Sequence, residues 1–280
     1  MKIGIIGQGF VGEAVNQGLK NYFEIETYDK YVGEKSTCDS LAELCSKTKI
    51  VFLCLPTPMN RDGSCNLQIV EQAVREINEV TSGKHTIVIK STVPPGTTER
   101  FNAAYENVNA VFNPEFLTEA NYIDDFKDQN RIIIGGPRPH STKIKNLYEK
   151  AFKNVPIIKT HSTTAEMVKY TANCFLATKV SFANEIKQIC EKVQVDYDKV
   201  IEYATYDERL GNSHWKVPGP DGKSGFGGSC FPKDINALIY FAKALDINTD
   251  VLSAVWATNL RVRPEKDWEN LKGRAVNKNN

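Results

Sequence analysis

The chain has 280 residues, with 35 basic and 34 acidic side chains and a formal net charge of +1 at pH 7. A charge balance this close to zero gives no electrostatic reason to expect a nucleic-acid partner or an anionic membrane surface. No apolar run approaches the length of about 18 residues that a membrane span needs, and the glycine-rich start does not have the form of a signal peptide. The length fits about two domains.

The seven cysteines are spaced irregularly, without a C-x-x-C pair, and the four histidines are scattered. An odd number of cysteines in this pattern fits a reduced cytoplasmic protein better than a disulfide framework. Scattered histidines do not suggest a metal site. We therefore expect a cytoplasmic protein without a metal centre.

The N-terminal segment has the pattern of a dinucleotide-binding unit. An apolar run over 2–6 predicts a buried strand, the glycine-rich sequence GQGFVG occupies 7–12, and a helix to about Lys20 precedes a strand over 24–28 that ends at Asp29. The glycines permit a tight turn, and the helix N-terminus faces a pyrophosphate. Asp29 would accept hydrogen bonds from ribose hydroxyls and repel a 2′-phosphate, which favours NAD over NADP. The expected cofactor contacts in the turn are Gly7, Gly9, Phe10, Val11 and Gly12.

Strands and helices continue to alternate through the first half of the chain. Further strands are expected at 49–55, 86–90, 110–112 and 131–136, with helices near 40–46 and over 66–80. This alternation predicts an α/β fold with a Rossmann-like, doubly wound parallel sheet. Ligands bind such sheets beyond the carboxyl ends of the strands, so the loops 56–58, 91–97 and 113–119 should line one crevice.

The pattern changes near residue 161. The absence of Gly and Pro over 163–195 predicts one long helix, and shorter helices are expected at 197–205, 234–245 and 249–262. We expect a Rossmann domain over 1–160, a helical domain over 161–262 and a polar tail over 263–280 that frays at its end.

The stretch GFGGSCFPKD at 225–234 is the most informative part of the second half. Cys230 directly follows a glycine-rich turn, and Lys233 and Asp234 follow it closely. Backbone N–H groups and a nearby positive charge favour the thiolate form of a cysteine, so Cys230 is a candidate nucleophile. From the residues alone, a buried structural cysteine in a glycine-rich bend is the alternative.

Seven motifs, taken together and in this order, resemble the UDP-glucose/GDP-mannose dehydrogenase family. The resemblance covers nearly the whole chain to about residue 262 and is more specific than any single motif. The motifs are GQGFVG at 7–12, LPTPMNRDGS at 55–64, KSTVPPGTT at 90–98, NPEFLTEA at 113–120, RIIIGG at 131–136, EMVKYTANCFLATKVSFANE at 166–185 and GFGGSCFPKD at 225–234.

The resemblance implies an NAD-dependent four-electron oxidation of a nucleotide sugar, with UDP-glucose converted to UDP-glucuronate as the expected reaction. A primary alcohol becomes a carboxylate while two NAD⁺ are reduced in succession. Cys230 would add to the intermediate aldehyde as a thiolate, hydride loss would give a thioester, and water would cleave it. The implied enzyme is an oxidoreductase that serves polysaccharide biosynthesis.

The resemblance also assigns roles to four other side chains. Lys169 would stabilise a developing oxyanion, and Asn173, one helical turn further on, would orient the sugar or a water. Asp234 would assist Lys169, and Glu115 would be the general base that hydrolyses the thioester. Without the resemblance, Lys169 would be interpreted as solvated and Asn173 as a buried helix amide. The two carboxylates would then be helix-start residues.

The remaining assignments concern cofactor and substrate contacts. Thr92 and Glu119 are expected at the cofactor or the hydrolytic water, with a turn hydroxyl and a surface acid as the alternatives. Arg209 aligns with an arginine that reaches across a dimer interface to the substrate, although an extra loop at 214–222 weakens this assignment. The other expected contacts are Pro56 and Thr57 for the cofactor, and Phe116, Leu117, Phe226 and Gly227 for the substrate.

Members of the family continue into a second Rossmann-like domain that this chain does not reach. We expect a compact enzyme that forms a homodimer through the helix at 163–195, in the cytoplasm (a host cytoplasm if the source is viral). Two alternatives remain. One is a β-hydroxyacid-type two-electron dehydrogenase, which needs one NAD⁺ and no cysteine. The other is a non-catalytic nucleotide-binding partner of a full-length enzyme.

Overall fold

The computed structural model describes residues 1–81 and 83–279, and the chain divides into two compact units. The sheet unit comprises Met1–Thr57 and Leu67–Lys169, and the helical unit comprises Pro58–Asn66 and the chain from Tyr170 onward. The boundary therefore lies inside the long helix rather than near 161. The segment Pro58–Asn66 belongs to the helical unit because the Met59 backbone pairs with Val276 and its N–H donates to the Ala275 carbonyl at 2.9 Å.

The described part of the sheet unit consists of a seven-stranded sheet with helices. Its strands are β1 (Lys2–Ile6), β2 (Glu24–Tyr28), β3 (Ile50–Leu53), β4 (His85–Ile89), β5 (Val108–Phe112), β6 (Ile132–Gly135) and β7 (Ile157–Thr160). Its helices are α1 (Phe10–Leu19), the short η1 (Gly33–Lys35), α2 (Leu41–Lys47), α3 (Gln68–Val80), α4 (Thr97–Ala104), α5 (Tyr122–Lys127) and α6 (His140–Ala151).

The strand order is β2-β1-β3-β4-β5-β6-β7, and the expected Rossmann-like fold is confirmed. The sheet is parallel except at one pair, where β6 runs antiparallel to β5 with Phe112 opposite Gly135. The chain leaves the carboxyl end of β5, passes through a turn and α5, and enters β6 from that same end. The order reverses at β1, between β2 and β3, which is where proteins of this class bind ligands.

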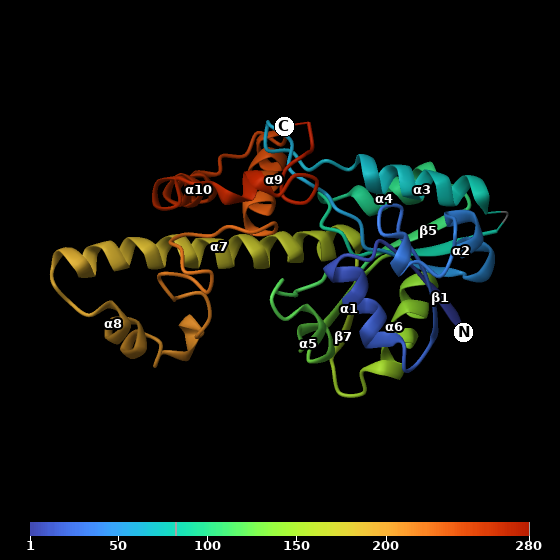
Figure 1. The fold of residues 1–280 in the computed structure, drawn as a ribbon, viewed down its shortest axis with the longest axis horizontal. Helices are drawn as coiled ribbons and strands as arrows, with labels where there is room; N and C mark the ends of the chain where they lie inside the picture. The colour runs from blue at the N-terminus through green and yellow to red at the C-terminus, as the bar shows by residue number, and fades with distance from the viewer. Residues whose placement is uncertain (82, 280) are drawn as a thin grey trace. The chain divides into compact units, whose positions relative to one another are not determined.

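The sheet is covered on both faces, as Figure 1 shows: α2, α3 and α4 lie on one face, and α1, α5 and α6 lie on the other. Successive side chains of a strand point to opposite faces. In β1, Ile3 and Ile5 accordingly join the apolar cluster beneath α1, while Ile6 joins the cluster beneath α2 and α3. Strands buried on both faces explain the continuous apolar runs in the sequence.

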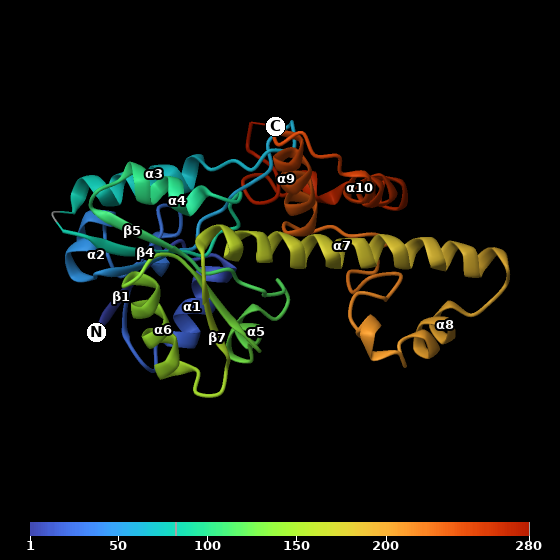
Figure 2. The ribbon, with the colours of Figure 1, turned by 180° about the vertical axis from the view of Figure 1, so that it is seen from behind.

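The helical unit is built around α7 (Ser162–Lys192), whose first turns belong to the sheet unit. Views from the front and from behind agree that α9 and α10 lie along one side of α7 and that α8 lies on the other (Figures 1 and 2). The four expected helices are confirmed, but the third begins three residues earlier than expected, so Cys230 is its N-cap residue. The elements after α7 are α8 (Tyr197–Ala204), η2 (Glu208–Leu210), α9 (Phe231–Lys243), α10 (Asp250–Val262) and η3 (Asp267–Asn270).

The C-terminal segment is folded into the helical unit, in contrast to the expected polar tail over 263–280. Trp268 is only 1% exposed and packs against Trp256, with ring centroids 5.3 Å apart. Ala275 and Val276 are buried beside it. A few apolar side chains therefore anchor this polar segment, most of which stays at least partly exposed. Its last residue, Asn280, lies outside the described residues.

Within the described residues, the structure contains no helix with the length and apolar character needed to cross a membrane.

We predict that Trp268→Ala lowers the free energy of unfolding of the helical unit by about 3–5 kcal/mol, because it removes a fully buried indole and leaves a cavity. Urea unfolding followed by near-UV circular dichroism measures this change. Val251→Ala, at a side chain that is 68% exposed, is the control and should change little. Equal, small effects of the two variants would mean that the C-terminal segment does not contribute to the core.

Candidate active site

The glycine turn after β1 has two glycines that the backbone requires and one that leaves open space. Gly7 has φ +88°, and a Cβ there would collide with the Cys54 carbonyl. A Cβ at Gly12 would collide with the Gly7 carbonyl. A Cβ at Gly9 would meet nothing within 4 Å. Bare backbone at the start of α1 is what the close approach of a pyrophosphate requires, so the turn fits a bound dinucleotide.

Asp29, the expected ribose ligand, ties this turn to the end of β2. One carboxylate oxygen accepts a hydrogen bond from the Gln8 amide at 2.6 Å. The other oxygen accepts from the amides of Tyr31 and Val32 at 2.8 and 3.0 Å. The sheet unit thus places Asp29 directly beside the glycine turn, as the sequence pattern predicts.

The loops that follow β3 and β4 are bonded to each other. The Thr57 hydroxyl donates to the Thr92 carbonyl at 2.8 Å, and the Ser91 hydroxyl donates to the Leu55 carbonyl at 2.6 Å. Thr57 and Thr92 are buried, whereas Pro56 is exposed. The structure therefore brings together the two loops that carry the expected cofactor contacts Pro56, Thr57 and Thr92.

Glu166, on the first turns of α7, supports the second of these loops and was not expected from the sequence. It is fully buried and accepts hydrogen bonds from the Gly96 amide at 2.6 Å and from the Thr98 amide at 2.9 Å. Burial raises the pKa of Glu166, although these hydrogen bonds oppose the rise. In the sequence, the only sign of this role is its position three residues before Lys169.

Glu115 and Lys169 form a buried ion pair within the sheet unit. Lys169 Nζ donates to the Glu115 main-chain carbonyl at 2.6 Å and to its carboxylate at 3.1 Å. The side chains are 10% and 3% exposed, respectively. Burial alone would raise the pKa of Glu115, but Lys169, the Leu117 amide and Lys90 outweigh it and hold that pKa below its ordinary value. The ionised form of the carboxylate is therefore favoured.

Phe116 and Leu117 follow Glu115 and are half-buried, while Glu119 is exposed. The Phe116 ring lies near two cations, with its centroid 4.0 Å from the Arg131 guanidinium carbon and 5.5 Å from Lys169 Nζ. The structure thus groups Phe116 and Leu117 with the ion pair.

In the helical unit, Cys230 is the N-cap residue of α9, a helix of 13 residues. Asp234, one turn into the helix, is 1% exposed and accepts a hydrogen bond from the Asn173 side-chain amide at 2.6 Å. Asp234 also forms an ion pair with Lys233. Burial would lower the pKa of Lys233, but electrostatic interactions with Asp234 and Cys230 outweigh burial and raise it above its ordinary value. Cys230 thus lies at a helix N-terminus, three residues before Lys233. Asp234 lies inside the helix and is not its N-cap.

The glycine-rich loop before Cys230 is held by α10. The Asn259 side chain accepts from the Phe226 amide at 2.7 Å and donates to the Phe226 carbonyl at 3.0 Å. Arg263 is 1% exposed and donates to the Ser224 carbonyl at 3.3 Å. A Cβ at Gly227 would collide with the Arg263 guanidinium, which explains the glycine. Asn259 and Arg263 were not expected, because their partners lie more than thirty residues away in the sequence.

Arg209 is not brought to the other candidate residues of the helical unit. It lies in η2, its side chain is 88% exposed, and it forms an ion pair with Asp207. The loop after it is fixed by Lys179, whose ammonium donates to the Leu210 carbonyl at 2.9 Å and lies 4.8 Å from the Trp215 ring.

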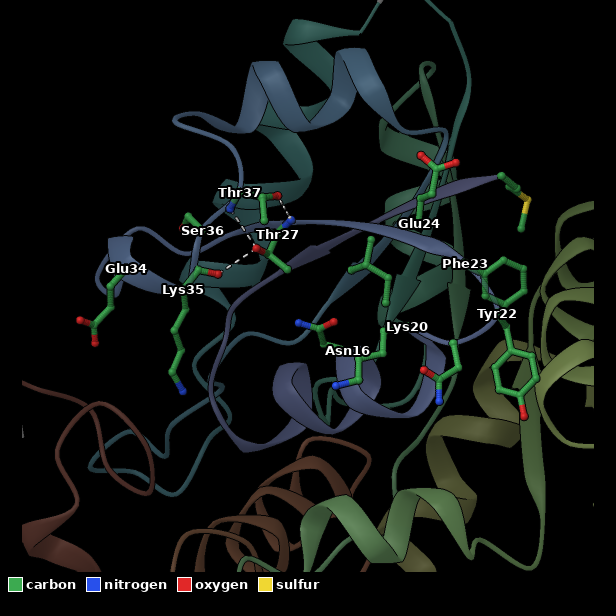
Figure 3. A pocket seen from close by; sticks show the side chains of 13 residues that line it. Asn16, Lys20, Tyr22, Phe23, Glu24, Thr27, Glu34, Lys35, Ser36 and Thr37 are labelled. Atoms are coloured by element: carbon green, nitrogen blue, oxygen red, sulfur yellow. Dashed lines mark hydrogen bonds between the residues drawn. The ribbon is translucent and has the colours of Figure 1, made fainter.

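A separate hollow of about 710 Å³ lies beside the edge strand β2 (Figure 3). Asn16 reaches it from α1, Lys20 from the end of that helix, and Lys35 from η1. In the same view, the Thr27 hydroxyl donates to the Lys35 carbonyl at 2.8 Å. Its lining comes from elements beside β2, so this hollow is distinct from the glycine turn. Among the described residues, no three His, Cys, Asp or Glu side chains are grouped so that they could hold a metal ion.

The fold and the glycine turn place this chain among the Rossmann-type dinucleotide-binding proteins. Two family models match it: "UDP-glucose/GDP-mannose dehydrogenase family, NAD binding domain" over residues 28–152, and the central domain of the same family over residues 163–261. The chain belongs to this family, which confirms the expected resemblance, and NAD is the cofactor that the matching domain indicates.

Two relatives illustrate the match. A UDP-glucose 6-dehydrogenase of Bacillus subtilis is 38% identical over 221 residues, which cover 76% of this chain and 47% of the relative. A UDP-glucose 6-dehydrogenase of Haloferax volcanii is 32% identical over 304 residues, which cover 92% of this chain and 69% of the relative. The chain therefore spans only about half the length of the Bacillus protein.

Among solved structures, a UDP-glucose dehydrogenase from the archaeon Pyrobaculum islandicum superposes with a TM-score of 0.85 at 30% identity, covering 93% of this chain and 68% of that one. A 3-hydroxyisobutyrate dehydrogenase from Mycobacterium tuberculosis superposes with a TM-score of 0.77 at 15% identity and covers 95% of this chain and 94% of that one. The second likeness shows a shared fold alone.

We predict that Gly9→Ala and Gly12→Ala fail in different ways. Gly9→Ala should fold normally but bind NADH about ten-fold more weakly or worse, because its methyl group occupies the open space beside the turn. Gly12→Ala should lower the free energy of unfolding by about 1–3 kcal/mol, because its methyl group meets backbone. Fluorescence titration with NADH and thermal melting separate the two effects. If Gly9→Ala binds NADH as tightly as the wild type, the assignment of the turn is wrong.

Proposed function

We propose that this chain catalyses the NAD-dependent four-electron oxidation of a nucleotide sugar to its uronate, through a covalent intermediate on Cys230. The observation that carries the proposal is the position of Cys230 at the N-terminus of α9, next to the cluster of Lys233, Asp234 and Asn173. A dehydrogenase that stops at the aldehyde has no use for a thiol in such a setting. The names of the relatives support a sugar nucleotide as substrate, and UDP-glucose is the substrate to test first.

NAD⁺, when bound at the glycine turn and Asp29, supplies the two-electron acceptor for each of the two oxidations. The Cys230 thiolate adds to the carbonyl carbon of the intermediate aldehyde and forms a C–S bond, which gives a thiohemiacetal. Loss of a hydride from the carbon (two electrons and one proton), together with loss of the hydroxyl proton, leaves a thioester. Water then attacks the thioester carbon, the C–S bond breaks, and the uronate leaves with Cys230 restored.

The side chains of the sheet unit would handle charge and protons in this sequence. Lys169 would stabilise the negative oxygen that develops in each addition step. Glu115 would accept the proton of the hydrolytic water. Its pKa lies below the ordinary value despite burial, so its carboxylate is ionised. Asn173 and Asp234, which are bonded to each other, would orient the sugar or a water molecule. Thr92 and Glu119 would contact the cofactor or that water.

The test is a count of NADH formed per nucleotide sugar consumed, starting with UDP-glucose and excess NAD⁺. The thioester route requires two NADH and a uronate product. Cys230→Ala should yield at most one NADH per sugar and no uronate, because the aldehyde cannot be captured as a thiohemiacetal. Cys190→Ala, at a buried thiol near the end of α7, is the matched control and should keep both NADH.

Other ratios of NADH to sugar would favour one of the two alternative functions. One NADH per sugar, with full turnover in Cys230→Ala, would indicate a two-electron dehydrogenase. No NADH from a folded protein that binds NADH would indicate a nucleotide-binding partner of a longer enzyme.

We further propose that the chain acts as a homodimer through the exposed face of α7. Phe175, Phe182 and Ile189 recur at intervals of seven residues on this helix and are 63%, 52% and 56% exposed. Residues at this spacing lie along one stripe of a helix, and an apolar stripe of this kind is typical of a contact surface. The exposed Arg209 would reach the substrate of the partner subunit.

We predict that the double variant Phe175→Asp and Ile189→Asp is monomeric in light scattering, because it places charges in an apolar contact. Val251→Asp, at an exposed apolar residue of α10, should leave the oligomeric state unchanged. If Arg209 acts across the interface, the monomeric variant should also lose turnover while it still binds NADH. A wild-type protein that is monomeric at the concentrations of the assay would contradict the proposal.

A further inference from the structure

The sheet unit contains a second buried lysine beside Glu115 to which the proposed reaction gives no role. Lys90 directly follows β4 and is 4% exposed. Its Nζ donates to the Asn113 side-chain oxygen at 3.0 Å and lies 3.4 Å from the Pro114 carbonyl. A lysine in this setting is rare, because the transfer of an ammonium from water into a protein interior costs several kcal/mol unless partners compensate.

The partners of Lys90 are the residues that present Glu115. Asn113, Pro114 and Glu115 form one turn after β5, in which two consecutive carbonyls each accept a hydrogen bond from a lysine. Lys90 bonds the Pro114 carbonyl, and Lys169 bonds the Glu115 carbonyl. The turn is therefore held between two ammonium groups that come from different elements.

A neutral donor shares one of these acceptors. The Tyr148 hydroxyl donates to the same Asn113 oxygen at 2.6 Å, and the Asn113 amide donates to the Ile133 carbonyl at 2.7 Å. Asn113 is 2% exposed and Tyr148 is 1% exposed. The turn thus has one charged support, Lys90, and one uncharged support, Tyr148, and the two can be removed separately.

The charges that face Lys90 explain its electrostatic effect. Burial lowers the pKa of Lys90 to about 8, while Glu115 and the Cys54 thiol oppose this shift and Lys169 adds to it. Burial raises the pKa of Cys54 to about 12 and raises that of Tyr148, so both groups are neutral near pH 7. Glu115 is then the carboxylate on which both ammonium groups, Lys90 and Lys169, act.

We infer that Lys90 is a positioning residue for the general base: it holds the turn that presents Glu115, and its charge keeps that carboxylate ionised in a buried site. The inference rests on the proposed function only for the role of Glu115 as a base. Lys90 contacts the turn and would not contact the substrate, so it acts through Glu115.

The charge of Lys90 also regulates how strongly Glu115 holds a proton. Below pH 8 the ammonium opposes protonation of Glu115, since a protonated Glu115 would leave two buried cations without a counter-charge. As the pH rises through about 8, Lys90 releases its proton and the basicity of Glu115 increases. Removal of the Lys90 charge should therefore raise the pKa of Glu115.

The test measures Glu115 directly in the full chain and needs no substrate. Protein labelled with ¹³C at the glutamate carboxyls is titrated by NMR, and the Glu115 signal is identified by its loss in Glu115→Gln. In Lys90→Met, which keeps the length of the side chain without its charge, the midpoint of Glu115 should rise by about one pH unit or more. In Tyr148→Phe, which removes the neutral support of the same Asn113 oxygen, the midpoint should stay near the wild-type value.

A second experiment measures the rate of NADH formation as a function of pH, with saturating UDP-glucose and NAD⁺. The acidic limb of kcat should move to higher pH in Lys90→Met by the same amount as the NMR midpoint, with the KM for NAD⁺ unchanged, and should not move in Tyr148→Phe. If the wild type forms no NADH, the proposed function fails, but the NMR titration still decides the inference about Lys90.

Two outcomes would overturn the inference. The first is a Glu115 midpoint that is the same in Lys90→Met and the wild type. The second is an equal rise in both variants, which would mean that the turn needs support but no charge. If Lys90→Met does not fold, the NMR titration of the wild type is the test. The Glu115 signal should then show a second inflection near pH 8, where Lys90 loses its charge. The absence of this inflection would contradict the inference.

Discussion

The buried ion pair between Lys169 and Glu115 is the interaction on which the candidate site of the sheet unit depends. Loss of one partner from such a pair typically costs about 3–5 kcal/mol, because the other charge is left without compensation in the interior. Its geometry joins the turn after β5 to the first turns of α7. A carboxylate that would otherwise be neutral in an apolar interior is thereby kept ionised. The same contact thus contributes to stability and sets the charge of the carboxylate.

Helix α7 carries polar side chains that serve both units. Its first turns provide Glu166, which supports the loop after β4, and Lys169, which supports the turn after β5. Further along the helix, Asn173 bonds Asp234, and Asn184 accepts a hydrogen bond from the Gly225 amide at 3.2 Å. An uninterrupted helix of 31 residues fixes the order and spacing of these groups along its axis.

Local motifs were predictable, and distant supports were not. The conformation of the glycine turn at 7–12, and that of the glycine-rich loop before Cys230, depends on residues within a few positions. Both features can therefore be predicted from the sequence. Lys90 and Arg263 depend on partners that lie far away in the chain, and a lysine or arginine at the end of an element otherwise indicates solvent. The C-terminal segment was misjudged for a similar reason, since its composition is polar while Trp268 is almost fully buried.

The sequence by itself determined the alternation of strands and helices, the dinucleotide turn, the long helix and the position of a cysteine directly after a glycine-rich loop, because each of these follows from periodicity or from short-range steric demands. Only the tertiary structure decided that β6 runs antiparallel to β5, that Pro58–Asn66 belongs to the helical unit, and that two lysines bond consecutive carbonyls of the turn that carries Glu115. The physical reason is that these features arise from the burial of charge and apolar surface between segments far apart in the chain. No local pattern encodes the free energy of such contacts.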